Sequence, residues 1–396
     1  MTHSAPRRVL PILVLAQFAG TSLWFAVNAV MPDLQLAFGW PATAVGTLTS
    51  ALQAGFILGT LVFALLAIAD RHSARTVFLL CSLAGAACTV AAWARVADFS
   101  ALLAWRFATG FFLAGIYPVG MKIASQWFPQ GLGLALGWLI GALVLGSASP
   151  HALRAIGDSL PWHGVMLGVA ALAAAGGLAL FLCLPEPPGR KPAGTRPPPL
   201  QWRAGFVLWT DARVRSSVLG YFGHMWELYT LWVLMPLVLA TRLSGQALSI
   251  AAFAVLGAGA VGCVAGGYLA RRLGSAHVAA GQLGLSGLCC ITSPWLIDAP
   301  TLVFGLWLLL WGITVSGDSP QLSTLTARNA PPAVVGSVLT LTNCLGFTLS
   351  VISIELFVGL SKHLPLAHVL PWLGLGPALG LWALRPLLQA ERTRKV

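Results

Sequence analysis

The sequence predicts an all-α membrane protein with twelve transmembrane helices in two pseudo-symmetric six-helix bundles and both termini in the cytoplasm. Of its 396 residues, 57% are hydrophobic and 9% are charged, whereas an ordinary soluble domain carries about 25% charged residues. The apolar residues lie in runs close to the roughly 20 residues that a helix needs to cross a bilayer. Because a soluble protein with so few charges could not cover its surface, the composition favours a membrane bundle.

Twelve apolar stretches define the expected helices in chain order. They cover residues 9–32, 42–69, 75–96, 99–126, 132–150, 162–184, 214–240, 246–270, 276–297, 301–327, 334–361 and 366–388. The first stretch is too long for the apolar region of a signal peptide, so we expect it to be a retained helix. A polar, proline-rich segment, residues 185–211, separates six helices from six. We interpret it as a cytoplasmic linker between an N-terminal bundle (1–184) and a C-terminal bundle (212–396).

Basic residues are concentrated on one side of the expected bundle. The net charge of +12 would suggest a nucleic-acid partner in a soluble chain, but here Lys and Arg lie in short loops and at the chain ends. With the N-terminus in the cytoplasm, the basic residues that fall on the outer side are Arg95, Arg154, Arg242 and Lys362, and Arg106 lies within a helix. This asymmetry, together with the short loops, predicts a multi-pass protein of the bacterial inner membrane with no nucleic-acid partner.

The seven cysteines all lie inside apolar stretches. Their number is odd, and their spacing does not match a zinc site, so we interpret them as small packing residues. We therefore expect neither a disulfide framework nor a bound metal, and no cofactor.

The two halves resemble each other at an offset near 200 residues. Gly115, Pro118 and Pro129 recur as Gly317, Pro320 and Pro331 at a constant offset, and the pair MetPro occurs at 31–32 and again at 235–236. Transporters are commonly built from such repeats, with substrate near the midplane between them.

The loops between the second and third helix of each half carry a related pattern. The first has Ala69, Asp70, Arg71 and Arg75; the second keeps Gly267, Leu269, Ala270, Arg272 and Gly274, with Arg271 in place of the acid. This pattern resembles the cytoplasmic signature of the major facilitator superfamily, and the resemblance covers nearly the whole chain. Arg106 and Gly110 resemble a second motif of the same family. The resemblance implies the fold of that family and solute transport by alternating access, with no enzymatic activity. We expect a functional monomer, because the two halves of one chain already form the cavity.

The resemblance also assigns a gating role to the cytoplasmic loops. Acid–base pairs that involve Asp70, Arg71, Arg75 and Arg272 could latch the two halves in one state. The alternative is that these arginines only obey the rule that cytoplasmic loops are basic.

Five ionisable residues lie at membrane depth: Arg106, His224, Glu227, Asp318 and Glu355. Each costs on the order of 2.5–3.5 kcal/mol at a helix centre on insertion scales, so such groups usually face a cavity or a partner. We expect them to be candidates for proton coupling; for Arg106 this role is implied by the family resemblance, and a structural hydrogen bond to backbone carbonyls is the alternative.

His224 and Glu227 are three residues apart and share one helix face. An imidazole titrates close to physiological pH and burial favours the neutral form of a carboxyl group, so together they could form a proton relay. The alternatives are a hydrogen-bonded packing pair and, less favoured, metal ligation. Asp318 lies between Gly317 and Pro320, where an irregular backbone is tolerated if it lines a cavity.

Uncharged residues complete the expected substrate cavity. The candidates are Thr21, Trp24, Asn28, Tyr117, Tyr221, Trp226, Tyr229, Gln321 and Asn343. Polar residues of this kind can instead simply join helices by hydrogen bonds.

These features predict a secondary active transporter driven by the proton gradient. No GlyxxxxGlyLys[Ser/Thr] loop is present, so the chain is not itself an ATP-driven pump. A uniporter of the same fold is the close alternative, and a membrane-embedded enzyme is disfavoured because the acids are dispersed. The expected partners are a small-molecule substrate, protons and membrane lipid; an anionic, cationic, neutral or amphipathic drug-like substrate, and uptake or efflux, all stay open.

Overall fold

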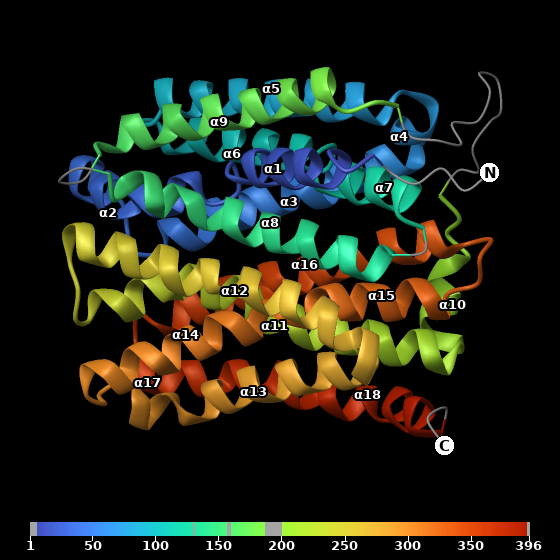
Figure 1. The fold of residues 1–396 in the computed structure, drawn as a ribbon. Helices are drawn as coiled ribbons and strands as arrows, with labels where there is room; N and C mark the ends of the chain where they lie inside the picture. The colour runs from blue at the N-terminus through green and yellow to red at the C-terminus, as the bar shows by residue number, and fades with distance from the viewer. Residues whose placement is uncertain (1–5, 130, 157–159, 187–199, 394–396) are drawn as a thin grey trace.

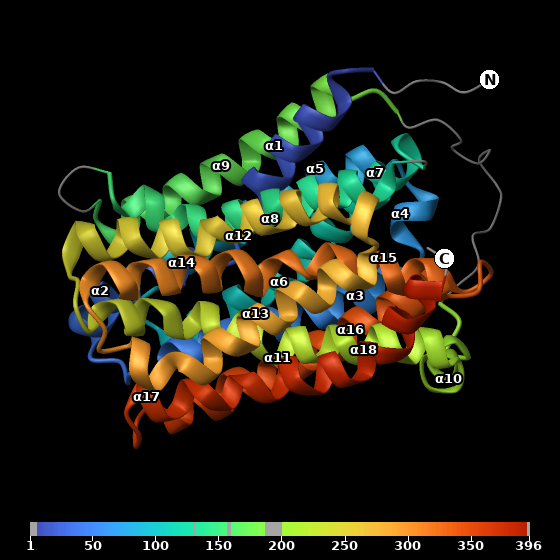
Figure 2. The same cartoon turned by 60° about the horizontal axis from the view of Figure 1, so that its bottom comes forward.

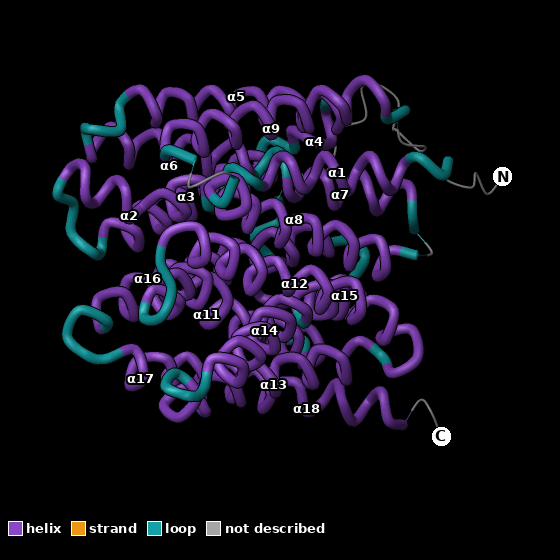
Figure 3. Tube along the Cα trace, turned by 60° about the vertical axis from the view of Figure 1, so that its left-hand side comes forward, coloured by secondary structure: helices purple, strands orange, loops and turns teal. Residues whose placement is uncertain are grey.

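The computed structural model describes residues 6–129, 131–156, 160–186 and 200–393, and within these ranges it contains helices and no strand (Figures 1 and 3). Residues 187–199 of the predicted linker lie outside the described residues. The long helices run side by side along one axis, with α1 to α9 on one side of the molecule and α11 to α18 on the other (Figure 1).

The helices of the first half are α1 (Val9–Thr21), α2 (Ala26–Phe38), α3 (Ala44–Leu65), α4 (Ile68–Arg71), α5 (Ala74–Ala94), α6 (Phe99–Leu113), α7 (Tyr117–Trp127), α8 (Leu132–Arg154) and α9 (Trp162–Cys183). The second half has α10 (Ala204–Thr210), α11 (Ala212–Ala240), α12 (Gly245–Leu273), α13 (Ser275–Leu296), α14 (Thr301–Gly317), α15 (Ser319–Asn329), α16 (Val335–Leu360), α17 (Leu366–Val369), a 3-10 turn (Leu370–Gly374) and α18 (Leu375–Thr393). Each predicted range overlaps a helix or a consecutive helix pair of the structure.

Three predicted helices are broken near their middle, and two more are divided near one end: 42–69 into α3 and α4, and 366–388 into α17, the 3-10 turn and α18. The first divides into α1 and α2, the fourth into α6 and α7, and the tenth into α14 and α15. Pro118 and Pro320 lie in the first turn of α7 and α15. The N–H groups of a first turn have no acceptor within the helix, so the N–H that proline lacks is not missed there. The breaks of the fourth and tenth helices therefore fall at the positions that the repeat relates.

Ten segments of the described chain are long and apolar enough to cross a membrane. The two remaining long helices are α11, with 29 residues, and α13, with 22. Both are more polar: α11 begins with two arginines and carries His224 and Glu227, and α13 contains His277 and Gln282. Both nevertheless pack inside the helical bundle (Figure 1).

The two halves meet along α8 with α12 and along α3 with α16. Glycines permit the first of these approaches: a Cβ on Gly137 would lie 3.0 Å from the carbonyl oxygen of Cys263, and a Cβ on Gly141 would lie 3.3 Å from that of Ala260. Small residues at helix contacts are the usual way in which membrane helices come close.

The start of α1 and the end of α18 lie at the same end of the bundle as α4, α7 and α10 (Figures 1 and 2). We call this the basic end, because the helix ends and short helices there carry Arg71, Arg75, Lys122 and Arg272. The opposite end, where α2 leads to α3 and α11 to α12, is called the far end.

The segment predicted as a linker is more structured than expected at its second end. Residues 204–210 form α10, which packs on α11 and α16 through the buried side chains of Ala204 and Leu208. A helix of seven residues is too short to show a hydrophobic period, which is why the prolines and charges around it suggested a loop.

Candidate functional site

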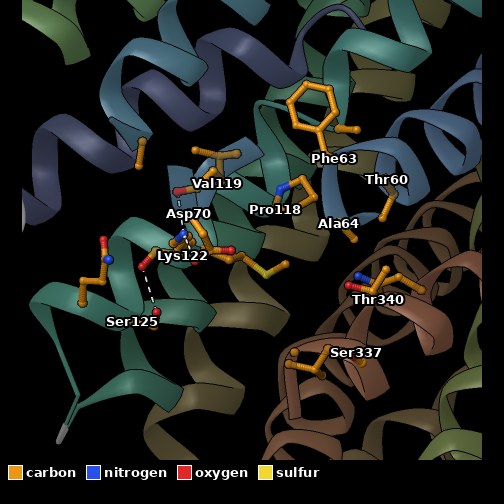
Figure 4. Close-up of a pocket in the computed structure, with 18 of the residues that line it drawn as sticks. Thr60, Phe63, Ala64, Asp70, Pro118, Val119, Lys122, Ser125, Ser337 and Thr340 are labelled. Carbon is orange, nitrogen blue, oxygen red and sulfur yellow. Dashed lines mark hydrogen bonds and ion pairs between the residues drawn. The ribbon is translucent and has the colours of Figure 1, made fainter. Parts of the chain in front are cut away.

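A cavity of about 650 Å³ opens at the basic end between the two halves (Figure 4). The first half contributes residues of α3 and α7, including Thr60, Phe63, Ala64, Pro118 and Val119, and the second half contributes residues of α15 and α16, including Ser323, Ser337, Thr340 and Asn343. Asn343, predicted as a cavity residue, therefore lines this space.

The cavity exists because α3 and α16 are in contact only toward the far end. There, Val358 packs where a Cβ on Gly46 would come within 3.2 Å, and the hydroxyl of Ser350 donates to Oε1 of Gln53 at 2.8 Å. Toward the basic end the same two helices line opposite walls of the cavity. Along α3 and α16 the two halves are thus packed together at the far end and separated at the basic end, whereas α8 and α12 stay in contact there, since a Cβ on Gly267 would lie 3.6 Å from the carbonyl oxygen of Gly133.

An aromatic cluster closes the space beyond the cavity. We use this name for Trp24, Phe25, Phe56, Tyr229, Trp232 and Phe347, all buried. The ring centroids of Phe56 and Phe347 are 4.6 Å apart, and those of Trp24 and Tyr229 are 5.7 Å apart and nearly parallel. Since each of these pairs joins one half to the other, the cluster forms a continuous apolar seal across the interface.

A small hollow of about 20 Å³ lies between the cavity and this seal. Its lining includes Tyr117, Tyr221, His224, Ser316, Ser319 and Tyr229. On α8 the lining passes from Leu136 in the cavity to Ile140 in the hollow, and on α16 it passes from Asn343 to Phe347. Four residues are about one helical turn, so the hollow lies one turn deeper than the cavity.

The central ionisable contact joins His224 and Asp318. Nδ1 of His224 lies 2.8 Å from Oδ1 of Asp318, and each side chain is 1% exposed. Neither group has an aligned hydrogen bond to the part of the chain that the structure describes, although the distance is short. The two groups are therefore close but not aligned for a hydrogen bond, and the carboxylate could accept from a further donor.

Asp318 occupies a special backbone position. It ends α14 and precedes the first residue of α15, so its side chain starts from the break in the tenth predicted helix. Gln282 of α13 packs over this break: a Cβ on Gly317 would collide with its amide group. A change in the charge of Asp318 would therefore act at the junction between α14 and α15.

Glu227 is buried in a separate site one turn along α11. Its Oε1 accepts from Nε1 of Trp311 at 2.6 Å and from Sγ of Cys290 at 3.2 Å, and its Oε2 accepts from Oγ of Ser286 at 2.9 Å. These donors come from α13 and α14. The expected direct pair of His224 and Glu227 is not formed, because each side chain is directed to a different partner.

Glu355 does not join this group. It is exposed on the outer surface of α16 and makes no hydrogen bond or ion pair within the described ranges. The expectation that it faces a cavity or a partner is wrong in this structure. Glu355 lies on the exposed face of α16, whereas the opposite face packs against α3.

Arg106 is fully buried against the break between α1 and α2. Nη1 donates to the carbonyl oxygen of Leu23 at 3.0 Å, and Nη2 donates to that of Trp24. A helix end leaves such carbonyls without intrahelical partners. The structure therefore shows the alternative given above, in which Arg106 makes structural hydrogen bonds to backbone carbonyls.

The other uncharged candidates divide into two groups. Trp24, Tyr117, Tyr221 and Tyr229 lie in the hollow or in the aromatic cluster. Thr21 donates to the carbonyls of Gln17 in its own helix and of Leu143 on α8, Asn28 donates to Thr49 of α3, and Trp226 meets Phe357 of α16 edge to face, so these three join helices instead. Gln321 is buried, and its amide nitrogen has no partner among the described residues.

The predicted cytoplasmic latch is not formed between the halves. Asp70 pairs with Lys122 of α7 at 2.5 Å (Figure 4), and Arg75 pairs with Glu186 at 3.3 Å, so both pairs stay within the first half. Arg71 and Arg272 are exposed, without a partner among the described residues. No pair forms between the described residues of the two halves here because the cavity separates Asp70 and Lys122 of the first half from α16 of the second half.

Sequence reasoning missed a contact that both halves share. In the first half Glu186, which follows α9, accepts from Ser73 at the start of α5; in the second, Glu391 of α18 accepts from the backbone N–H of Ala276 and contacts Nδ1 of His277 at 2.9 Å. The signal was the position of each acid just after the last predicted helix of its half, 162–184 and 366–388. No group of three metal-binding side chains occurs among the residues that the structure describes.

These features define a class: a helical membrane protein in two related halves, with a cavity between them and buried ionisable groups beyond its deep end. Comparison with known proteins gives the family. The sequence model of the Major Facilitator Superfamily matches residues 13–354. The chain belongs to this superfamily of membrane transporters, and its function is transport rather than enzymatic catalysis.

Individual relatives agree with this assignment. The chain is 27% identical over 343 residues to a chloramphenicol resistance protein of Streptomyces lividans, covering 85% of this chain and 84% of the relative. The crystal structure of the human organic anion transporter MFSD10 superposes with a TM-score of 0.74 at 20% identity, over 96% of this chain and 99% of that one. The Escherichia coli fucose:proton symporter FucP gives 0.67 at 14% identity, with coverages of 96% and 99%. These two structures are similar in fold.

Proposed function

We propose that this protein is a proton-coupled secondary active transporter that exports a small amphipathic aromatic solute by alternating access. The observation that carries the proposal is the contact of His224 with Asp318, buried one helical turn beyond the deep end of a cavity that is open at one end of the bundle. Protons and solute would thus meet in the same short stretch of the interface.

The coupling follows from the cost of buried charge. Removing one partner of a buried ion pair costs about 3–5 kcal/mol, because the other charge is left uncompensated. A proton gained or lost by His224 and Asp318 changes the balance of charge at the joint between α14 and α15. A change of this size in one conformation alone is enough to shift a two-state population by orders of magnitude.

The proposed topology places the basic end in the cytoplasm, since cytoplasmic loops carry the excess of Lys and Arg. Counting α11 and α13 with the ten apolar segments gives twelve spans, both termini in the cytoplasm, and an N-terminal bundle, a linker and a C-terminal bundle. We place the protein in a bacterial inner membrane as a monomer, because the two halves of one chain form the cavity. The cavity then faces the cytoplasm, where an exported solute would be loaded.

The substrate class rests on the chemistry beside the hollow. Tyr117, Tyr221 and Tyr229 offer ring faces with a polar edge, and Ser316 and Ser319 add hydroxyl groups. Such a lining suits an aromatic solute that carries a few polar groups. The Streptomyces lividans relative, named a chloramphenicol resistance protein, supports export of a solute of this kind.

The test is transport in proteoliposomes with an imposed pH gradient, using chloramphenicol and a panel of aromatic amines and acids. Wild type and Asp318→Asn are compared, with Glu355→Gln as the matched control because Glu355 is an exposed acid. We expect gradient-driven flux that Asp318→Asn loses and Glu355→Gln keeps. Flux that follows only the solute gradient, equal in all three proteins, would show a uniporter and overturn the proton coupling.

A further inference from the structure

The short helix α10 exposes three large aromatic side chains on one face. Trp202 just before it is 60% exposed, Phe206 is 73% exposed and Trp209 is 48% exposed. Their spacing of four and three residues places them in a single row. Water is a poor solvent for such a row, so the face requires a partner.

The opposite face of α10 is already occupied. Ala204 and Leu208 are buried in a small apolar cluster with Val214 and Val218 of α11 and with Val338 of α16. The helix is therefore held firmly against the second half, and the orientation of its exposed face is fixed by this packing.

Basic residues border the aromatic row. Arg203, Arg213 and Arg215 are exposed, and Arg215 donates to the carbonyl oxygen of Trp209 at the end of α10 at 2.7 Å. The acid nearest to them in sequence, Asp211, accepts from the backbone N–H groups of Arg213 and Val214, and so caps α11. The surface as a whole is positive and aromatic.

The position of α10 corresponds to the boundary of the bilayer. With 29 residues, α11 is about 43 Å long, whereas the hydrocarbon core is about 30 Å thick. The excess length leaves room for the first turns of α11, on which α10 packs, to lie outside the hydrocarbon at the basic end. The Trp209 ring leans along α11 toward Phe222, with ring centroids 6.5 Å apart, so the row is turned toward the lipid side.

We propose that the aromatic and basic surface of α10 binds the headgroups of anionic phospholipids in the leaflet at the basic end. Tryptophan is enriched at the level of the headgroups, and juxtamembrane arginines are attracted to anionic lipids. Charge complementarity and the depth of the helix favour this partner over a soluble protein.

The lipid surface is linked to the cavity entrance. Leu200 and Gln201, which lead into α10, line the cavity, and the backbone N–H of Gln201 donates to Oγ of Ser337 on α16 at 3.0 Å. Bound anionic lipid would hold this segment against the second half. An effect of anionic lipid on transport rests on the function proposed above, whereas lipid binding does not.

The test measures lipid binding directly, without any transported solute. Purified full-length protein is titrated with phosphatidylglycerol or phosphatidylcholine, and bound lipid is counted by native mass spectrometry. The variant is Arg203→Gln with Arg213→Gln and Phe206→Ser; the control is Arg271→Gln with Arg385→Gln, two exposed arginines at the same end that lie outside α10.

We expect the α10 variant to bind phosphatidylglycerol at least fivefold more weakly than wild type, with the control unchanged and phosphatidylcholine binding unaffected. Equal binding by the α10 variant and wild type would overturn the proposal. So would an equal loss in the control, because it would show attraction to the general charge of the basic end. If the triple variant does not fold, Arg203→Gln alone is compared with Arg271→Gln alone, and the same difference in direction is required.

Discussion

Replacing Glu227 with leucine isolates the role of its buried hydrogen bonds. The three donors lose their acceptor unequally. Oγ of Ser286 retains the carbonyl of Leu283 at 3.1 Å, and the thiol of Cys290 is a weak donor, but Nε1 of Trp311 has Glu227 as its only described acceptor. An orphaned buried donor costs about 1–3 kcal/mol, so this is the expected loss in the free energy of unfolding.

Glutamine at position 227 keeps an oxygen for Trp311, so Glu227→Gln is expected to cost less than about 1 kcal/mol. The assay is thermal unfolding of purified protein in detergent, read out by the exposure of buried thiols. The expected order of midpoints is wild type, then glutamine, then leucine, with the leucine variant lower by a few degrees.

A double-mutant cycle tests the stated cause. In a Trp311→Phe background the indole N–H is absent, so Glu227→Leu should cost about 1–3 kcal/mol less than it does in the wild type. Additive effects, or a leucine variant as stable as the glutamine variant, would refute the assignment of the energy to this hydrogen bond.

Three further predictions concern the packing and the ends of the bundle. A Cβ on Gly110 would lie 1.9 Å from a backbone carbonyl oxygen of α3, so Gly110→Ala should lower stability by about 1–3 kcal/mol, whereas Gly359→Ala, which meets open space, should not; equal melting curves would contradict this. Ser350→Ala removes the buried hydrogen bond from Ser350 to Gln53 between the halves, worth about 1 kcal/mol. A cysteine introduced at the far end should then be modified about fivefold faster by an impermeant maleimide; an unchanged rate would argue against a role of this hydrogen bond in closing the far end. Asp70→Asn breaks a half-exposed pair and should change stability by less than about 1 kcal/mol; a larger fall in the midpoint of thermal unfolding would mean that the pair is coupled to more than the local loop.

The helices could be predicted from the sequence because the bilayer imposes a length that apolar runs must match. The prolines that define the breaks before α7 and α15 were also visible, since Pro118 and Pro320 recur at one offset. The short α10 could not be seen, because its order comes from packing on α11 and α16 and not from any period of its own.

The identity of the buried groups was predictable, but their pairing was not. Hydropathy identifies His224, Glu227 and Asp318 as costly at membrane depth, whichever partner they have. Helical spacing suggested that His224 would meet Glu227, yet side chains on one face can be directed to different neighbouring helices, and α13 and α14 supply better donors to Glu227. Whether Asp70 and Arg75 pair within their own half or across to the other depends on how far apart the two halves are, and a transporter sequence must allow more than one such arrangement.

Glu186 and Glu391, the acids near the end of the last helix of each half, have a mechanical consequence. Glu186 ties the start of α5 to the end of α9, and Glu391 ties the start of α13 to α18. Each of these braces begins and ends in the same half. They stiffen each bundle as a unit without joining the two bundles, so the resistance to rocking comes from the contacts between the halves, α8 with α12 and α3 with α16. A change that loosens a brace should soften one bundle, whereas a change at the contact of Gln53 with Ser350 should alter how the two bundles lean against each other.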